Sequence, residues 1–268
     1  MIKNTKIIFL DLDGTLLNNS NEVTEYTKKI IKKVKEKGIY VVLCSGRANS
    51  DIITKSKEAN ASPIIISNNG SMIFDYESNI KIYESKIDHQ FLEELWDFEK
   101  KHNINITYNS THKRYKSKNS TKDATIIYDI SEITDNVSQI VIDSKNYKDI
   151  KELEKLIKEK YNKLKIKNFW KQNIGKSNNY YFEMDITNKF NSKGRAINKV
   201  LKTLNINKNN AICFGDQIND EPMFKMCGTK IAMKNGNKKL QKEADFITEY
   251  TNSEDGVAKF IDEYILCK

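Results

Sequence analysis

The chain is organised around residues 7–15, which read Ile7-Ile8-Phe9-Leu10-Asp11-Leu12-Asp13-Gly14-Thr15. Four bulky apolar residues in succession are typical of a short strand that is buried on both faces of a parallel sheet. The run ends at an aspartate, and a second aspartate follows two positions later. This stretch therefore predicts a central buried strand over residues 7–10 whose carboxyl end carries two carboxylates.

Helices and strands alternate on the C-terminal side of this strand. Apolar residues recur at helical spacing between residues 22 and 37, and Gly38 stands where a helix stop is expected. A strand over residues 39–43, a helix over 48–60 and a strand over 64–66 are expected next. This alternation predicts right-handed crossovers and a parallel sheet.

The pattern changes near residue 79. Two expected helices, over residues 89–101 and 147–161, are mixed with β-like runs, which is typical of an α+β domain. These runs cover residues 104–108, 124–128, 137–142, 164–170 and 180–185.

The α/β alternation then returns and divides the chain. The later elements are expected as helices over 192–204 and 220–226 and as strands over 211–214 and 229–232. We therefore predict an α/β core domain formed by residues 1–80 and 188–268, interrupted by an inserted α+β domain over residues 81–187.

Composition narrows the possible classes of protein. The 268 residues are 38% hydrophobic and 30% charged with a net charge of +9, which supports a packed core and suits an anionic ligand. No apolar run approaches the roughly 20 residues that span a bilayer, so we expect a cytoplasmic protein without membrane contact. Oligomeric state stays open.

The cysteines lack CxxC spacing and a nearby histidine, and are expected as reduced core thiols: Cys44, Cys213, Cys227 and Cys267.

Residues that suit phosphate chemistry follow four of the expected strands. Because ligands of a parallel sheet gather outside the carboxyl ends of its strands, these segments are candidates for one site. Carboxylates can hold a divalent cation there, and hydroxyls and backbone N–H groups can hold a phosphate. Taken alone, the first segment fits an ordinary acidic turn equally well, and it gains weight from the others. The four segments are residues 11–15, 45–47, 67–70 and 215–220.

Together these segments resemble the haloacid dehalogenase superfamily, and more narrowly its Cof-type sugar-phosphatase branch. Residues 231–236 and 254–258 resemble the C-terminal pattern of that branch, so the resemblance spans the whole chain in order. It implies a Rossmann-like parallel-sheet core with an inserted α+β cap domain. The motifs that carry it are residues 11–17, Ser45-Gly46-Arg47, Asn69-Gly70, Lys193-Gly194 and Gly215-Asp216 with Asn219-Asp220.

The resemblance also implies a role for each matching residue. Asp11 would attack the phosphoryl group to give an aspartyl-phosphate, and Asp13 would protonate the leaving alkoxide and then deprotonate water. Mg²⁺ would lie on the carboxylates of Asp11 and Asp216 and the backbone carbonyl of Asp13. Asp220 would stand behind these ligands, and Lys193 would neutralise charge on phosphorus. The residues expected at the phosphate or the substrate are Thr15, Ser45, Gly46, Arg47, Asn69 and Asn219.

The expected function is hydrolysis of a small phosphate monoester, such as a sugar phosphate. Phosphotransfer or mutase action through the same aspartyl-phosphate is an alternative, and a non-enzymatic phosphoacceptor or nucleic-acid-binding module is another. The basic stretch 112–118 resembles a nucleic-acid patch in composition, but we expect a solvated cap loop there. The expected partner is therefore a small phosphorylated metabolite and not a nucleic acid.

Overall fold

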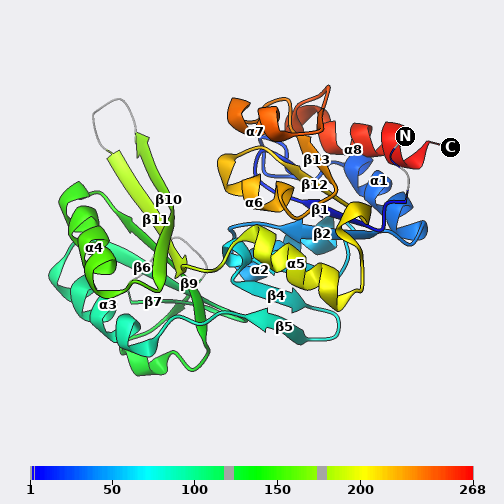
Figure 1. Cartoon of the computed structure of the whole chain (residues 1–268). Coiled ribbons are helices and arrows are strands. Elements are labelled where there is room, and N and C mark those ends of the chain that lie inside the picture. Colours follow the sequence, from blue (N-terminus) through cyan, green and yellow to red (C-terminus); the bar gives the residue numbers. More distant parts are fainter. Residues whose placement is uncertain (1, 3, 118–123, 174–179, 268) are drawn as a thin grey trace. The chain divides into compact units, whose positions relative to one another are not determined.

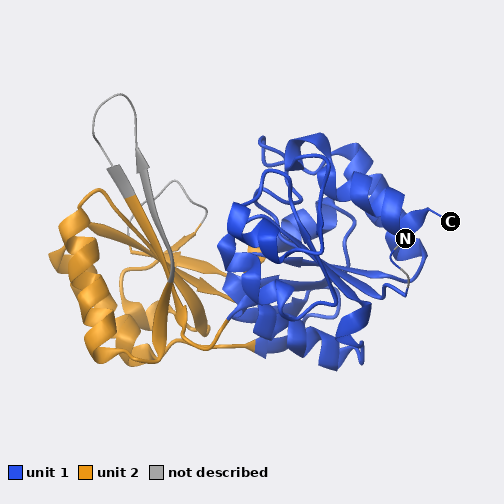
Figure 2. Cartoon of the chain, turned by 45° about the horizontal axis from the view of Figure 1, so that its top comes forward, with its two compact units in different colours: residues 1–47, 51–83, 192–268 blue, residues 48–50, 84–191 orange. Residues whose placement is uncertain are grey.

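The chain forms two compact units, which are coloured separately in Figure 2. The core unit comprises residues 1–47, 51–83 and 192–268, and the inserted unit comprises residues 48–50 and 84–191. The structure is a computed structural model, which describes residues 2, 4–117, 124–173 and 180–267. For residues 167–173, 180 and 181 it describes the backbone alone, and Lys118 of the basic stretch lies outside the described residues.

An eight-stranded sheet forms the centre of the core unit (Figure 1). β1 (Ile7–Leu10) pairs in parallel with β2 (Tyr40–Cys44) on one side and with β12 (Ala211–Gly215) on the other. β13 (Thr229–Ala232) and β14 (Phe246–Ile247) extend the sheet beyond β12 in the same direction. Beyond β2 follow β3 (Ile64–Ser67), β4 (Met72–Asp75) and β5 (Ile80–Glu84).

Helices cover both faces of this sheet, which explains why β1 is apolar throughout. Ile8 and Leu10 pack in one apolar cluster, and Ile7 and Phe9 pack in another on the opposite face. The first cluster includes side chains of α1 and α8, and the second includes side chains of α5, α6 and α7. The helices are α1 (Glu25–Glu36), α2 (Asn49–Glu58), α5 (Lys193–Thr203), α6 (Glu221–Phe224), α7 (Lys238–Glu243) and α8 (Gly256–Ile261).

The inserted unit contains a six-stranded sheet with the order β10-β11-β9-β6-β7-β8. Residues of β6, β9 and β11 join those of its two helices in a separate apolar cluster, so this unit has a core of its own. Its strands are β6 (Ile104–Ser110), β7 (Arg114–Lys116), β8 (Thr125–Ile126), β9 (Val137–Ser144), β10 (Leu164–Asn173) and β11 (Tyr180–Asn188), and its helices are α3 (His89–Lys101) and α4 (Tyr147–Lys160).

The predicted fold class is confirmed, with one addition to the parallel sheet. β3 pairs antiparallel with β4, because only a few residues separate the two strands and a parallel crossover needs a dozen or more. The helix predicted over residues 220–226 is confined to α6. A 3₁₀ turn over Ile218–Asp220 precedes it, where the Asp220 side chain accepts from the Gln217 N–H.

Three smaller expectations are wrong. The run 124–128 forms only the two-residue strand β8, and Cys267 is exposed while the other three cysteines are buried. The basic stretch is an exposed loop only at His112 and Lys113, because the following strand β7 pairs antiparallel with β6, with Tyr115 opposite Tyr108. Tyr115 and Lys116 are both buried as a result.

None of the helices in the described part of the chain has the length and apolar composition needed to span a bilayer.

Candidate active site

The strand order of the core sheet places Asp11 and Asp216 near each other. From β1 the chain runs outward through β2 to β3, and it later returns to the other side of β1 at β12. A parallel sheet has its binding crevice where the strand order reverses, outside the carboxyl ends of the strands. Asp11 follows β1, Asp216 follows β12, and the Asp11 N–H donates to the carbonyl of Phe214 at 3.2 Å. Two of the predicted carboxylates therefore meet at this switch point.

Lys193 joins these carboxylates in the interior of the core unit. Its Nζ donates to Asp11 Oδ1 at 2.5 Å and to Asp220 Oδ1 at 2.7 Å. The three side chains are almost completely buried: the exposed fraction is 2% for Lys193, 8% for Asp11 and 0% for Asp220. Lys193 is the first residue of α5, where the N-cap Ser192 accepts from the Arg195 N–H. The lysine thus reaches the carboxylates from the capped end of a helix.

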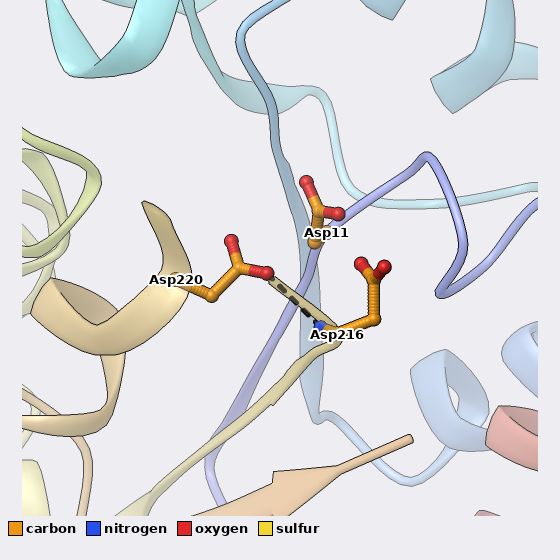
Figure 3. A group of neighbouring side chains, drawn as sticks. All are labelled: Asp11, Asp216 and Asp220. Carbon is orange, nitrogen blue, oxygen red and sulfur yellow. Dashed lines mark hydrogen bonds between the residues drawn. The ribbon is translucent and has the colours of Figure 1, made fainter. Parts of the chain in front are cut away.

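Asp220 connects Lys193 to the loop that carries Asp216. One oxygen of Asp220 accepts from Lys193, and the other accepts from the backbone N–H groups of Asp216 and Gln217 at 3.0 and 3.1 Å. The contact with Asp216 is the dashed line in Figure 3. Both carboxylate oxygens of Asp220 are therefore engaged by the chain itself.

Three buried carboxylates share this small volume. Asp11, Asp216 and Asp220 each contribute an oxygen, and these oxygens lie within 4.8 Å of one another. Figure 3 shows the Asp11 and Asp216 carboxylates pointing toward a common space. Such a group of oxygen ligands suits a hard divalent cation.

The charges of the site are unbalanced, because one ammonium faces three carboxylates. Burial raises the pKa of Asp11 well above its ordinary value, and the charge of Asp220 adds to this rise while that of Lys193 offsets part of it. Burial also raises the pKa of Asp216, again with a contribution from Asp220. For Lys193, burial alone would lower the pKa, but the charges of Asp11 and Asp220 hold it above its ordinary value. The lysine is therefore charged, and a further cation beside Asp11 and Asp216 would favour the ionised forms of these two carboxylates.

The loop after β1 packs directly against Asp216. Thr15 Oγ1 donates to Asp216 Oδ1 at 3.1 Å. Gly14 has a φ of +78°, and a Cβ on it would lie 2.4 Å from Asp216 Oδ2. Only glycine fits this combination of left-handed backbone and close approach.

Asp13 belongs to a second, more exposed group. The Arg47 guanidinium donates to both carboxylate oxygens of Asp13, through Nε at 2.9 Å and through Nη2, and Nη2 also donates to Asn21 Oδ1. The Arg47 and Asp13 side chains are 25% and 59% exposed. Solvent thus reaches Asp13, whereas Asp11 is closed off from it.

The segments after β2 and β3 are joined through their backbones. Ser45 and Asn69 are both buried, and the Asn69 N–H donates to the carbonyl of Ser45 at 3.2 Å. Gly46 packs against the Asn69 side chain, where a Cβ would lie 2.9 Å from Asn69 Oδ1. Gly70 approaches the start of α5, where a Cβ would lie 2.3 Å from the carbonyl oxygen of Ser192. The predicted phosphate-binding segment is therefore built against the helix that carries Lys193.

The comparison with protein families agrees with this arrangement. The sequence model of the haloacid dehalogenase-like hydrolase family matches residues 8–261, which is nearly the whole chain. The chain belongs to this family. The prediction of an enzyme of this superfamily is thereby confirmed.

Relatives of this hydrolase match along nearly their full lengths. A protein named 5-amino-6-(5-phospho-D-ribitylamino)uracil phosphatase, from Bacillus subtilis, is 31% identical over 265 residues, covering 97% of this chain and 96% of that protein. A putative phosphatase of Buchnera aphidicola subsp. Baizongia pistaciae is 30% identical, covering 96% of this chain and 97% of that protein. The hydrolase therefore falls among proteins named as phosphatases.

Solved structures agree with the fold of this hydrolase. A haloacid dehalogenase-like hydrolase from Bacteroides thetaiotaomicron superposes with a TM-score of 0.83 at 25% identity, covering 96% of this chain and 98% of that one. A sugar phosphatase of subclass IIB superposes with a TM-score of 0.76 at 20% identity, covering 98% and 100%. The second likeness concerns the fold alone.

Two residues of the hydrolase site were not singled out from the sequence, and one predicted residue, Asn219, is exposed. Gln217 Nε2 donates to Asp216 Oδ2 at 3.1 Å, and Asn21 accepts from Arg47. Gln217 stands inside the motif 215–220, which is the signal that could have found it, whereas nothing in the sequence around Asn21 indicates its contact. Asn219 is exposed next to these groups in the chain.

Proposed function

We propose that the chain is a Mg²⁺-dependent phosphatase that hydrolyses a small phosphate monoester, a sugar phosphate or a related metabolite, in the cytoplasm. The observation that carries this proposal is the buried contact between Lys193 Nζ and Asp11 Oδ1 at 2.5 Å. An aspartate held by a buried lysine at a strand end is suited to nucleophilic attack on phosphorus, because the lysine offsets negative charge in the transition state.

The carboxylates of the site fit a divalent cation. When bound, Mg²⁺ would keep Asp11 ionised beside an anionic substrate and stabilise charge on the phosphoryl oxygens. We propose the carboxylates of Asp11 and Asp216 and the backbone carbonyl of Asp13 as its ligands. Asp220 stands behind them, since both of its oxygens already accept hydrogen bonds from the chain.

The residues of the site divide the chemistry into two displacements. In the first, an oxygen of Asp11 attacks phosphorus, the bond from phosphorus to the leaving oxygen breaks, and Asp13 gives its proton to the alkoxide. In the second, Asp13 takes a proton from water that attacks the aspartyl-phosphate, which releases inorganic phosphate and restores Asp11. The exposure of the Asp13 side chain, 59%, supports its role as the group that exchanges protons with water and the leaving group.

The remaining residues of the site hold the substrate in this proposal. The Ser45 hydroxyl and the Gly46 N–H bind phosphate oxygens, and Lys193 stabilises the charge that develops there. The segment 81–187 acts as a cap domain that selects the substrate. The other residues assigned to the phosphate or the substrate are Thr15, Arg47, Asn69 and Asn219.

The test is release of inorganic phosphate from a panel of phosphorylated sugars, nucleotides and cofactors, with and without Mg²⁺. The panel includes the ester in the name of the Bacillus subtilis relative. Asp11→Asn removes the nucleophile while keeping its shape. Asp88→Asn is the matched control, because Asp88 is an exposed N-cap of α3 and asparagine caps a helix equally well.

We expect Mg²⁺-dependent phosphate release on a subset of the panel, no release by Asp11→Asn and unchanged release by Asp88→Asn. Release by Asp11→Asn at the wild-type rate would refute the nucleophile. Consumption of substrate without free phosphate, with the phosphoryl group found on an isomer or acceptor, would replace hydrolysis by phosphotransfer.

A further inference from the structure

One short turn, residues 235–237, touches both loops that carry the carboxylates of the site. It lies between β13 and α7, and none of its residues has a role in the proposed chemistry. On one side it contacts the loop after β1, and on the other it contacts the loop after β12. These are the two loops that diverge from the switch point of the sheet.

The contact with the first loop is made by the Asn235 side chain. Its Nδ2 donates to the carbonyl of Gly14 at 2.8 Å, and its Oδ1 accepts from the Asn252 N–H at 3.0 Å. Asn252 in turn is 8% exposed, and its Nδ2 donates to the carbonyl of Leu17 at 2.8 Å. Two linked asparagines therefore hold the backbone of residues 14–17 at two points.

The contact with the second loop is made by the backbone of the same turn. The Asn237 N–H donates to the carbonyl of Asp216 at 2.7 Å. Gly236 packs so closely that a Cβ would lie 3.0 Å from that same carbonyl oxygen and 2.8 Å from the carbonyl oxygen of Met233. Residue 236 thus has no room for a side chain beside the Asp216 backbone.

We infer that the turn 235–237 is a brace that sets the separation of the Asp11 and Asp216 loops for the cation, with Asn235 as a positioning residue. The inference rests on the proposed Mg²⁺ site. Its physical basis is repulsion: Asp11 and Asp216 lie on loops joined directly by the Thr15 hydrogen bond to Asp216, and their carboxylates repel each other to the extent that both are ionised. A brace that bonds to both backbones opposes that separation before a cation arrives.

The experiment measures Mg²⁺ binding to the full chain by calorimetric titration, repeated with Mn²⁺ by electron paramagnetic resonance. Asn235→Ala removes the side-chain half of the brace. We expect the dissociation constant of each cation to rise about fivefold, the factor that corresponds to losing the one direct hydrogen bond to the loop after β1, at the Gly14 carbonyl. The free energy of unfolding of the metal-free chain is measured beside it by urea titration.

The matched control is Asn207→Ala. Asn207 is also an exposed asparagine with a side-chain contact to the backbone, accepting from the Asn209 N–H at 2.9 Å. It precedes β12, at the end of the strand opposite to Asp216. We expect this variant to change the free energy of unfolding and to leave cation binding as in the wild type.

Gly236→Ala tests the other half of the brace without touching a side-chain contact. Its methyl group would push the turn away from the Asp216 carbonyl, so we expect a larger rise in the dissociation constant than for Asn235→Ala. If this variant does not fold, Asn235→Ala with its control still decides the question.

The outcomes separate the brace from the cation site itself. Unchanged cation binding by Asn235→Ala, or an equal loss in Asn207→Ala, would overturn the brace and leave the proposed Mg²⁺ site standing. A wild-type chain that binds neither Mg²⁺ nor Mn²⁺ would overturn the cation site, and the brace with it.

Discussion

Lys193 in the core unit and Lys158 in the inserted unit each contact a carboxylate at 2.7 Å, but in different surroundings. Lys193 meets Asp220 where the two side chains are 2% and 0% exposed. Lys158 meets Glu154 on the surface of α4, where they are 70% and 22% exposed. The distance is the same, but the two ion pairs differ strongly in burial.

Burial determines how much stability is lost when one partner of each ion pair is removed. A charge in the interior has lost its water, so removing its partner leaves a charge that nothing else stabilises. A charge on a helix surface keeps its water, and its ion pair contributes little to stability. Groups of buried charges are retained where chemistry needs them, which is why the core pair belongs to the proposed active site and the α4 pair does not.

The largest effect is expected from Lys193→Met, which removes the buried ammonium while keeping an apolar chain of similar length. Three carboxylates would remain with no cation among the described side chains that contact them. We expect the free energy of unfolding of the metal-free chain to fall by about 3–5 kcal/mol and phosphatase activity to be lost. Urea unfolding followed by circular dichroism measures the first, and phosphate release measures the second.

Asp11→Asn provides the control for this prediction, because it removes one negative charge from the same cluster. A double variant that combines it with Lys193→Met should recover part of the lost stability, since fewer uncompensated carboxylates remain. A single Lys193→Met variant as stable as the wild type would show that the buried pair contributes no more than a surface pair.

Asp220→Asn is expected to have the next largest effect. Both oxygens of Asp220 accept hydrogen bonds, one from Lys193 and one from two backbone N–H groups, and an amide NH₂ would face donors on one side. We expect a loss of about 1–3 kcal/mol in the free energy of unfolding, with a fall in kcat because Lys193 loses its second charged partner. Denaturant titration and steady-state kinetics check the two parts, and an unchanged kcat would exclude a positioning role for Asp220.

Local patterns were sufficient to predict the elements that are buried on both faces or amphipathic. The predicted strand 7–10 and the predicted helix 89–101 coincide with β1 and α3. In each case an apolar run or a helical repeat reports directly on burial. β5 was missed because it lies at the edge of the sheet, partly exposed, with no regular apolar pattern to mark it.

The site was predictable as a set of residues but not as a set of contacts. Asp11 and Asp220 are predicted from motifs at strand ends, and Lys193 from the motif Lys193-Gly194. The structure brings their charged groups together, across a separation of 182 residues for Asp11 and Lys193. The pairing of Arg47 with Asn21 was not predictable, because it depends on the left-handed backbone of Asn21, with a φ of 63°. Such loop conformations are selected by tertiary contacts, which no local pattern encodes.

A change of pH is expected to affect the stability of the folded chain less than the substitutions of Lys193 and Asp220 do. Because the pKa values of Asp11 and Asp216 are raised in the folded chain, their contribution to stability is present below their ordinary values, about pH 4, and is lost as pH rises through the raised values. Mg²⁺ should reverse this loss by favouring the ionised forms. We therefore expect added Mg²⁺ to raise the Tm more at pH 8 than at pH 5, as measured by calorimetry.

Asp216→Asn is the control for the pH prediction, since it removes one titrating carboxylate and one proposed ligand. Its Tm should depend less on pH in the absence of metal and should respond less to Mg²⁺. An equal response to Mg²⁺ at pH 5 and pH 8 in the wild type would show that these carboxylates do not titrate together with cation binding.

The smallest effect on stability is expected from Glu154→Gln on α4, which removes the charge of the carboxylate in the exposed ion pair. The Glu154 carboxylate accepts from Lys151 and Lys158 at 2.7 Å each, and these two hydrogen bonds lower its pKa. Its contribution to stability is thus present above the ordinary value for glutamate and is lost as pH falls through the lowered value. At pH 7 we expect the Tm to change by only about 1 °C, with phosphate release unchanged. A loss of stability as large as that of Lys193→Met would mean that contact distance, and not burial, determines how much an ion pair stabilises this chain.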